Sequence, residues 1–365
     1  MIFLSILSFL FWPIVIIGLI IFFAVRRGRH SKANKEWHSQ FALSKEDAVS
    51  QLFFLLSFLF LGVTLLALNK DFGDPLPWRT IIFITSLLGL IGAYYLKAIY
   101  VLIFSIIGVA GWWVAQAALW VDQKNTASSA VFLGLSLLAL LFYVLGHLHE
   151  KEARFKRFSL VYSAFGVVAP TFILFLFSTK PGIALIEQMI KGGSFFHSWQ
   201  LTLSLFILFA SLMVSAFWAV AQKLIFPLEL LAVFALTLLF GGTALLSEQP
   251  MFLSAGSYYS YYDNKSFSGV GLLLAMLYNV AILLELMGLI FSGYVRRASW
   301  LINLGAVFLF LLIIVKYFDW FFSFMSKSVF FVGAGILFFL VGWFMEQGRK
   351  SVVSKIKVQN QQIPE

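Results

Sequence analysis

A succession of long apolar segments is the feature that most constrains this chain of 365 residues. A helix needs about 20 mostly apolar residues to cross the hydrocarbon core of a bilayer. Eleven segments come close to this length or exceed it, namely residues 2–25, 51–69, 80–96, 99–120, 127–147, 158–178, 199–221, 224–246, 269–294, 298–316 and 327–345. Backbone polar groups in lipid must be paired within the protein, and segments of this length achieve that as helices. The sequence therefore predicts an all-α, polytopic membrane bundle of about eleven transmembrane helices.

The amino-acid composition excludes a soluble domain. Apolar residues make up 61% and charged residues 12% of the chain, whereas soluble domains are about half apolar and about a quarter charged. The net charge of +10 would suggest nucleic acid in a soluble protein. In a membrane protein, topology and anionic lipid explain it, so we expect no nucleic-acid partner. Because the chain has no cysteine, it has no disulfide and no Cys-ligated metal.

The positions of Lys and Arg predict the orientation of the chain in the membrane. The densest basic clusters fall on alternate loops, at residues 26–45, 151–157, 296–297 and 349–357. With the N-terminus outside, these alternate loops hold most of the 26 Lys and Arg residues. The sequence therefore predicts an N-out, C-in topology in a cytoplasmic (inner) membrane. Anionic lipid headgroups are the expected partners of the basic inner loops.

The same pattern divides the chain into four parts. Residues 1–25 are expected to form a signal-anchor helix, because the positive charges follow the apolar run and no small-residue cleavage site precedes them. Residues 26–50 are a basic cytoplasmic linker. Residues 51–346 are a transmembrane bundle of about ten helices, and residues 347–365 are a basic cytoplasmic tail. The sequence indicates no particular protein partner.

Two of the predicted outer loops have distinctive sequences. Ile183, Ile186 and Ile190 recur at helical spacing in the first, which predicts a short interfacial helix over residues 181–190. The second loop contains four tyrosines within five residues, Tyr258, Tyr259, Tyr261 and Tyr262. These rings could stack on a sugar or on a partner protein. An aromatic belt at the lipid headgroups is the favoured interpretation.

Glu285 is the strongest candidate for a functional residue. It lies about 5 Å from the predicted midplane of the span 269–294, at 1.5 Å per residue. A carboxylate there costs about 2.5–3.5 kcal/mol on insertion scales, so it should be paired, hydrated or protonated. The same helical face carries small or polar residues, Tyr278, Ala281, Gly288 and Ser292. This pattern predicts a proton or cation site that faces other helices, with a buried, protonated structural glutamic acid as the alternative.

Two amide side chains within the spans are weaker candidates. Asn279 lies on the same span as Glu285 but on another face, so interhelical hydrogen bonding is its expected role. Gln116 follows Gly108 and Gly111 in the fourth span. It is either a hydrogen-bonding group between helices, which is favoured, or a donor that lines a pore.

The remaining charged residues in or beside the spans favour structural roles. Glu229, in the first turn of a helix, is expected to interact with the helix dipole. His147 and Glu150 share a helical face, but their set is too small and too poorly spaced for a metal site. Lys316 and Asp319 could form an ion pair at the outer interface. We therefore predict no metal, no cofactor and no catalytic residue.

The C-terminal third carries a set of residues with a recognisable order. They are Gly293, Arg296-Arg297, Asn303, Gly305, Tyr317-Phe318-Asp319, Ser328, Phe330-Phe331, Gly342-Trp343, Glu346 and Arg349, preceded by the glycine-rich fourth span with Gln116. In these residues the chain resembles a bacterial family of multi-pass predicted membrane proteins of unknown function, over about residues 45–350. The resemblance implies the same membrane-bundle architecture. It implies no activity, cofactor or catalytic residue.

Three functions are compatible with these features. The span count, Glu285 and the small-residue face around it favour a transporter or permease for a small molecule or a lipid. A structural or accessory protein of an envelope complex is the alternative, because no second intramembrane charge partners Glu285. A membrane-embedded enzyme acting on a lipid-linked substrate is less favoured, since it needs titratable groups clustered at one interface.

Overall fold

The computed structural model describes residues 45–124, 126–190, 193–246, 253–254 and 266–321, with parts of 331–350. The described residues all belong to one compact unit, Ser44–Val353. The predicted signal-anchor helix 1–25, most of the linker and the end of the tail lie outside the described residues. So do the four tyrosines of the second outer loop, Tyr258, Tyr259, Tyr261 and Tyr262.

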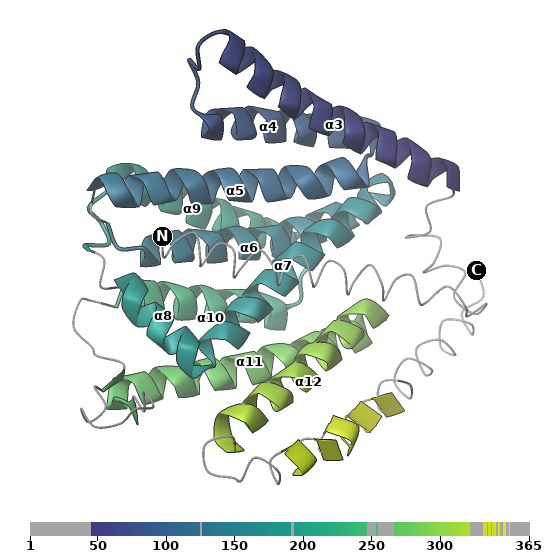
Figure 1. Cartoon of the computed structure of the whole chain (residues 1–365). Coiled ribbons are helices and arrows are strands. Elements are labelled where there is room, and N and C mark those ends of the chain that lie inside the picture. The colour runs from purple at the N-terminus through teal and green to yellow at the C-terminus, as the bar shows by residue number, and fades with distance from the viewer. Residues whose placement is uncertain are drawn as a thin grey trace, which may run out of the picture. The chain divides into compact units, whose positions relative to one another are not determined.

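Among the described residues, nine helices are long and apolar enough to cross a membrane (Figure 1). They are α3 (Lys45–Asp71), α4 (Trp78–Leu96), α5 (Ile99–Lys124), α6 (Ser129–Glu150), α7 (Lys156–Phe177), α9 (Trp199–Ala221), α10 (Pro227–Ala244), α11 (Gly269–Val295) and α12 (Ser299–Phe321). These nine correspond to the second through tenth predicted spans, and the predicted all-α, multi-pass membrane bundle is confirmed. Of the eleventh predicted span, the structure describes an apolar helical stretch at Phe331–Leu340.

Three shorter elements connect the long helices. The 3-10 turn η2 (Ala153–Phe155) joins α6 to α7, and α8 (Lys180–Ile190) follows α7. Two-residue strands, β1 (Leu253–Ser254) and β2 (Ser266–Phe267), pair antiparallel between α10 and α11. Helix α8 confirms the short helix predicted over residues 181–190. Its three isoleucines are buried, and α8 packs against α6, α7 and α11, so protein covers this apolar stripe.

The hairpin of α6 and α7 forms the buried centre of the bundle. Both helices are apolar on most faces and are largely covered by their neighbours. Gly146 and Gly166 let the two backbones approach closely, because a Cβ at Gly166 would lie 2.2 Å from the backbone nitrogen of Tyr143. Small residues at such crossings are typical of helix pairs in membranes, where close van der Waals packing replaces the hydrophobic driving force.

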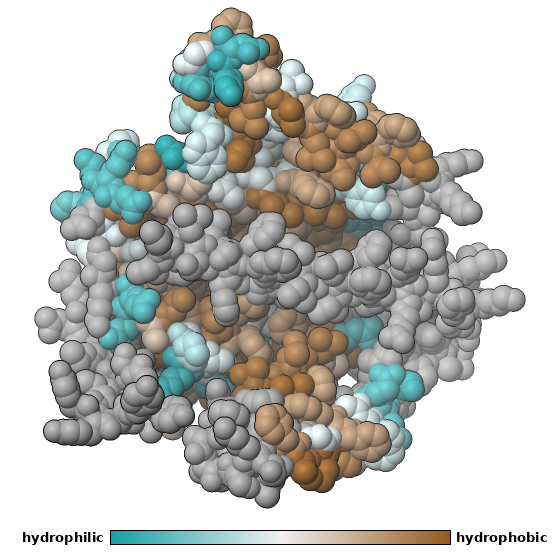
Figure 2. All heavy atoms as spheres, viewed as in Figure 1, coloured by the Kyte–Doolittle hydropathy of each residue, from teal (hydrophilic) through white to brown (hydrophobic). Residues whose placement is uncertain are grey.

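Helix α3, in contrast to α6 and α7, is mostly exposed. Leu52, Phe53, Phe60 and Val63 are each about 60% exposed. Figure 2 shows apolar surface along α3 and hydrophilic surface at the turn toward α4. In a membrane protein an apolar exposed helix is expected to face lipid, since the bilayer takes the place of a protein core.

Three very short turns join consecutive spans, and each has a basic residue in the left-handed region. Lys97, Lys223 and Arg297 have φ of 54°, 58° and 55°. Glycine is the usual residue at this helix C-terminal position, because it has no Cβ to clash. A basic side chain there interacts favourably with the negative end of the helix dipole, which offsets part of the strain.

These turns lie at the same end of the bundle. The side chain of Gln51 at the start of α3 bonds to the backbone of both Lys97 and Ile99. Lys151, which follows α6, donates to Gln222 in the turn that follows α9. The consecutive spans therefore alternate in direction. We call this end the Arg296 end.

Candidate functional site

Helix α11 carries a stripe of polar side chains on its buried side. Tyr278, Glu285 and Ser292 follow one another at intervals of seven residues, and Arg296 caps the end of the helix. Because seven residues make almost two helical turns, these side chains return to nearly the same face. Tyr278 bonds to α10 and Glu285 to α7, whereas Ser292 and Arg296 both bond to Glu229 of α10. The stripe is the candidate functional site.

Among the described residues, Glu285 has one hydrogen-bond partner, Thr171 of α7. The Thr171 Oγ1 lies 2.9 Å from Glu285 Oε1 and 2.8 Å from the backbone oxygen of Val167. The other carboxyl oxygen, Oε2, is buried without a hydrogen-bond partner in the described part of the chain. The predicted intramembrane carboxyl is therefore present, enclosed and only half satisfied.

The single hydroxyl proton of Thr171 cannot serve both of its neighbours fully. When Glu285 is ionised, Thr171 donates to Oε1 and gives up its bond to the Val167 oxygen. When Glu285 is protonated, the carboxyl can donate to Thr171 Oγ1, and Thr171 can then donate to Val167. The proton on Glu285 therefore decides which way the threonine hydroxyl points.

Helix α7 contains a proline beside this threonine. Pro170 lies inside the helix, one residue before Thr171. Proline has no N–H, so the carbonyl of Gly166 loses its usual helical donor. The proline thus weakens the backbone ladder of α7 in the turn that faces Glu285.

The predicted polar face around Glu285 is narrower than expected. Tyr278 is fully buried, and its hydroxyl lies 2.8 Å from Thr243 Oγ1 of α10. Ser292 donates to Glu229 Oε1 at 2.7 Å. Gly288 is exposed, with no atom within 4 Å of an added Cβ. It lies about 60° around the helix from Glu285, which moves it outside the buried stripe.

Asn279 joins α11 to the end of α7. Its Nδ2 donates to the backbone oxygen of Ser178 at 3.1 Å and to that of Ala275 at 2.6 Å. Lys316 of α12 donates to the same Ser178 oxygen at 2.5 Å. The interhelical bond expected for Asn279 is present. Lys316, which was expected to pair with Asp319, bonds like Asn279 to the carbonyl end of α7.

Gln116 does not belong to the stripe. It is half-buried on α5, and its side chain makes no hydrogen bond to the described residues. The indole nitrogen of Trp113, three residues earlier, is also buried without a partner there. No contact with the described residues therefore supports either role expected for Gln116, a hydrogen bond between helices or a donor that lines a pore.

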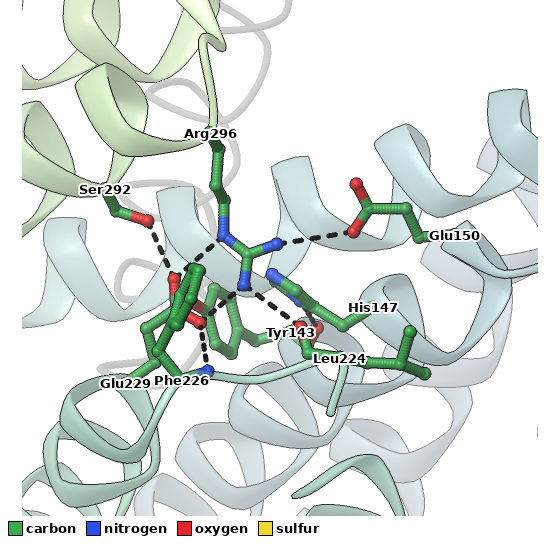
Figure 3. Close-up of polar contacts among 8 residues, drawn as sticks. All are labelled: Tyr143, His147, Glu150, Leu224, Phe226, Glu229, Ser292 and Arg296. Atoms are coloured by element: carbon green, nitrogen blue, oxygen red, sulfur yellow. Dashed lines mark hydrogen bonds and ion pairs between the residues drawn. The ribbon is translucent and has the colours of Figure 1, made fainter. Parts of the chain in front are cut away.

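At its end, the stripe meets an ion-pair cluster that the sequence did not predict (Figure 3). Arg296 donates to both carboxylate oxygens of Glu229, through Nε at 2.9 Å and Nη2 at 2.5 Å. Its Nη2 also donates to the backbone oxygen of Leu224, and its Nη1 lies 3.4 Å from Glu150. We call Arg296, Glu229, Glu150 and Ser292 the Arg296 latch.

The central pair of the latch is largely shielded from water. The side chains of Arg296 and Glu229 are 15% and 11% exposed. Burial by itself lowers the pKa of Arg296, but the hydrogen bonds and charge of Glu229 outweigh burial and raise it. The guanidinium therefore stays charged. Glu229 also accepts from the backbone nitrogen of Phe226, so its expected role at the start of α10 is present as well.

The sequence contained a partial signal for the latch. Glu150, Glu229 and Arg296 all fall beside loops that the charge pattern places on one side of the membrane. Residues at the same membrane depth can pair, but the sequence does not say which helices are neighbours. Only the packing of α6, α10 and α11 brings these three side chains together.

The two histidines of α6 are held by hydrogen bonds. His147 is buried, with Nδ1 2.9 Å from the backbone oxygen of Tyr143. His149 lies 2.6 Å from Tyr94 Oη through Nε2 and 2.7 Å from the backbone oxygen of Leu145 through Nδ1. The described residues contain no group of three or more His, Cys, Asp or Glu that could hold a metal ion.

One pocket of about 390 Å³ opens at the far end of the bundle from the latch. It is lined by residues of four segments, Ala127, Ser129, Ile190, Gly193, Ser194, Phe195, Phe196, Ala244, Leu245 and Leu246. Its walls are mostly apolar and include no titratable side chain. Neither Glu285 nor any residue of the latch lines this pocket.

Comparison with known proteins assigns no relative to the chain. No family model, no curated protein and no solved structure matches it. The resemblance to a bacterial family of multi-pass membrane proteins therefore stays a prediction.

Proposed function

We propose that this chain is an eleven-span, N-out, C-in protein of the bacterial inner membrane. We further propose that it transports a small molecule or a lipid and that Glu285 carries a proton during transport. The enclosed carboxyl of Glu285 supports this proposal most directly. It lies within a membrane span, and in the described part of the chain it has one hydroxyl partner and one buried oxygen that no group bonds.

A structural role alone does not account for this carboxyl. A glutamine at the same position would keep the interhelical bond without the cost of a protonatable group in the membrane. A carboxyl adds the ability to gain and lose a proton. At Glu285 that change redirects the hydroxyl of Thr171, which lies beside Pro170 in the weakened turn of α7. Proton binding is thereby coupled to the backbone of a neighbouring helix.

A non-transporting accessory role is the second candidate. The observation that favours it is the close packing around Glu285, since the pocket at the far end of the bundle does not reach the carboxyl. In that case Glu285 is a neutral, buried acid that holds α11 against α7. The exposed apolar faces of α3 and α9 would then meet lipid or partner spans.

Transport is tested with the purified chain in liposomes under an imposed pH gradient. The vesicles are incubated with a bacterial small-molecule extract, or carry a fluorescent phospholipid, and their contents and leaflets are analysed with and without a protonophore. We expect one compound or the lipid to move only with the gradient, and E285Q to reduce the movement at least tenfold. E152Q, which removes an exposed loop carboxylate, is the matched control.

The protonation state of Glu285 is measured independently. Infrared difference spectra of the wild type and E285Q should contain the carbonyl band of a carboxylic acid that only the wild type shows. Equal transport by the wild type and E285Q rejects the role of Glu285. No movement of extract or lipid in either protein favours the accessory role.

The cysteine-free chain allows the topology to be tested directly. Asn125→Cys and Glu152→Cys place a single thiol on predicted outer and inner loops. We expect a membrane-impermeant maleimide to label the first thiol in intact spheroplasts and the second only after lysis. The opposite pattern would reverse the proposed orientation.

A further inference from the structure

The α11–α12 hairpin meets the rest of the bundle along two different kinds of contact. Helix α11 packs closely against α12 and α7, with their backbones near one another along the contact. Between α10 and α11, by contrast, the described backbones come close at few positions. Long polar side chains span this contact instead. We call it the α10–α11 seam.

At one end, the seam is closed by the Arg296 latch. Ser292 and Arg296 of α11 both bond to Glu229 of α10. Arg296 also bonds to the Leu224 oxygen just before α10 and lies near Glu150 of α6. Figure 3 shows the guanidinium placed between the two acidic side chains, which come from different helices.

At the other end, a second set of polar bonds holds α11. Tyr278 bonds to Thr243 of α10 across the seam. Asn279 and Lys316 both donate to the carbonyl oxygen of Ser178, which caps α7. We call Asn279, Lys316 and Ser178 the Ser178 clamp. Its bonds tie both helices of the hairpin to α7.

Glu285 lies between the latch and the clamp. Along α11 it is about 9 Å from Asn279 and about 16 Å from Arg296, at 1.5 Å per residue. Between Glu285 and the latch, Leu286 and Leu289 are buried in the structure. Polar bonds made by the α11–α12 hairpin therefore close both ends of the path to the Glu285 carboxyl.

Polar bonds differ from apolar packing in how they separate. Interlocked apolar side chains resist separation over their whole contact area. A few charge-assisted bonds can exchange for water or for other partners at a helix end, where water is near. A seam held by such bonds can alternate between a bonded and an open arrangement, which is what a switching element needs.

We propose that the Arg296 latch is a gate: when it opens, the α11–α12 hairpin moves away from α10 along the seam and exposes Glu285 from the Arg296 end. This inference rests on the proposed function, because it gives the proton-carrying carboxyl its access route. The Ser178 clamp keeps the other end closed while the latch is open. The structure shows the state in which both are closed.

The gate is tested by the accessibility of a single thiol. Leu289→Cys places a reporter on the buried face of α11, between Glu285 and the latch. Leu274→Cys is the matched control, equally buried and near the clamp. The rate of reaction with a charged methanethiosulfonate reagent is measured in the full chain, with and without E229Q or R296K.

Both latch variants remove a charge-assisted bond and keep a polar partner of similar size, and circular dichroism checks their fold. We expect each to raise the reaction rate of the Leu289 thiol about tenfold, as expected for the loss of one such bond, and to leave the Leu274 thiol within twofold. R296K serves as the independent second variant if E229Q does not fold. Unchanged rates at Leu289 in a folded variant overturn the gate, as does an equal rise at both thiols.

This assay needs no transport substrate, so the gate and the proposed function can fail separately. A faster Leu289 reaction together with no transport in liposomes keeps the gate and rejects the transport function. Proton-driven transport together with an unchanged Leu289 reaction keeps the function and rejects the gate.

Discussion

Glu285 and Arg296 lie on the same face of α11, but their charged groups have very different numbers of polar partners. Arg296 has four acceptor contacts, two of them with one carboxylate in a bidentate pair. Glu285 has one hydroxyl partner and one buried oxygen without a partner among the residues that the structure describes. The bundle thus satisfies its buried cation at the helix end and leaves its buried acid half satisfied within the span.

Depth along the helix accounts for the difference. At the Arg296 end, helix termini supply free backbone carbonyls and loops supply acidic residues, so a cation finds several partners. Within the span, most backbone groups are already paired inside their helices, and among the described residues a threonine hydroxyl is the group that bonds Glu285. A carboxyl in such surroundings is poorly held as an anion, which suits a group that exchanges a proton and does not suit a fixed structural charge.

The largest effect is expected from removing the cation of the latch. R296A leaves Glu229 buried without its partner, which costs about 3–5 kcal/mol in the free energy of unfolding. Unfolding in mixed micelles measures this value. R154A, which breaks an exposed pair with Glu152, is the control and should change stability by less than about 1 kcal/mol. A loss of less than 1 kcal/mol in R296A would mean that the latch pair is not important for stability.

The same substitution at the two acids should then give different results. E229L removes the bidentate partner of Arg296, leaving this cation only its longer contact with Glu150 and its bond to the Leu224 oxygen. It also removes a bond to the Phe226 nitrogen, so we expect a loss of about 3 kcal/mol or more. E285L removes a poorly satisfied carboxyl, while Thr171 keeps its bond to Val167. It should change stability by no more than about 1 kcal/mol in either direction. Equal losses at the two sites would contradict the comparison.

A smaller effect is expected from removing the Thr171 hydroxyl, which bonds Glu285. T171V removes that bond and should cost about 1 kcal/mol. T237V is the matched control, because Thr237 is also buried and its hydroxyl bonds only to the Val233 oxygen one turn earlier. The difference between the two variants measures the Glu285 bond. If T237V costs as much as T171V, the bond to Glu285 contributes nothing to stability.

The smallest effect is expected from alkaline pH. Its bonds to Glu229 and the charge of that carboxylate hold the pKa of Arg296 above its ordinary value in the folded protein. A raised folded pKa gives a stability contribution that is fully present below the unfolded pKa and is lost only as pH rises through the folded value. The stability difference between the wild type and R296A should therefore stay constant from about pH 7 to about pH 10. A decline over this range would show that the pair is opened by something other than loss of the arginine proton.

The sequence predicted the spans well, because in a membrane the length of an apolar run is itself the folding signal. The second through tenth spans end within a few residues of their predicted limits, apart from the longer helices α3 and α12. Helix α3 begins at Lys45, inside the predicted linker 26–50, and α12 runs to Phe321. Charged residues at these ends can continue a helix into the headgroup region, so hydropathy underestimates its length.

Glu285 was also found from the sequence, since an acid within an apolar run stands out in any hydropathy reading. The sequence could not show which residue bonds it, because Thr171 lies 114 positions away and resembles every other buried threonine. The latch was missed for the same reason. Its members come from α6, α10 and α11, and each taken alone has the ordinary sequence of a helix end.

The sequence by itself therefore determined that the chain is a helical membrane protein, where most of its spans begin and end, and which acid lies within a span. Those properties follow from local apolar length and from the cost of charge in lipid. The tertiary structure alone decided which side chains meet Glu285, that Arg296 pairs with Glu229, and that α10 and α11 are joined by polar side chains. Those properties depend on which helices are neighbours, and apolar sequences do not specify this, because any apolar face can pack against another or against lipid.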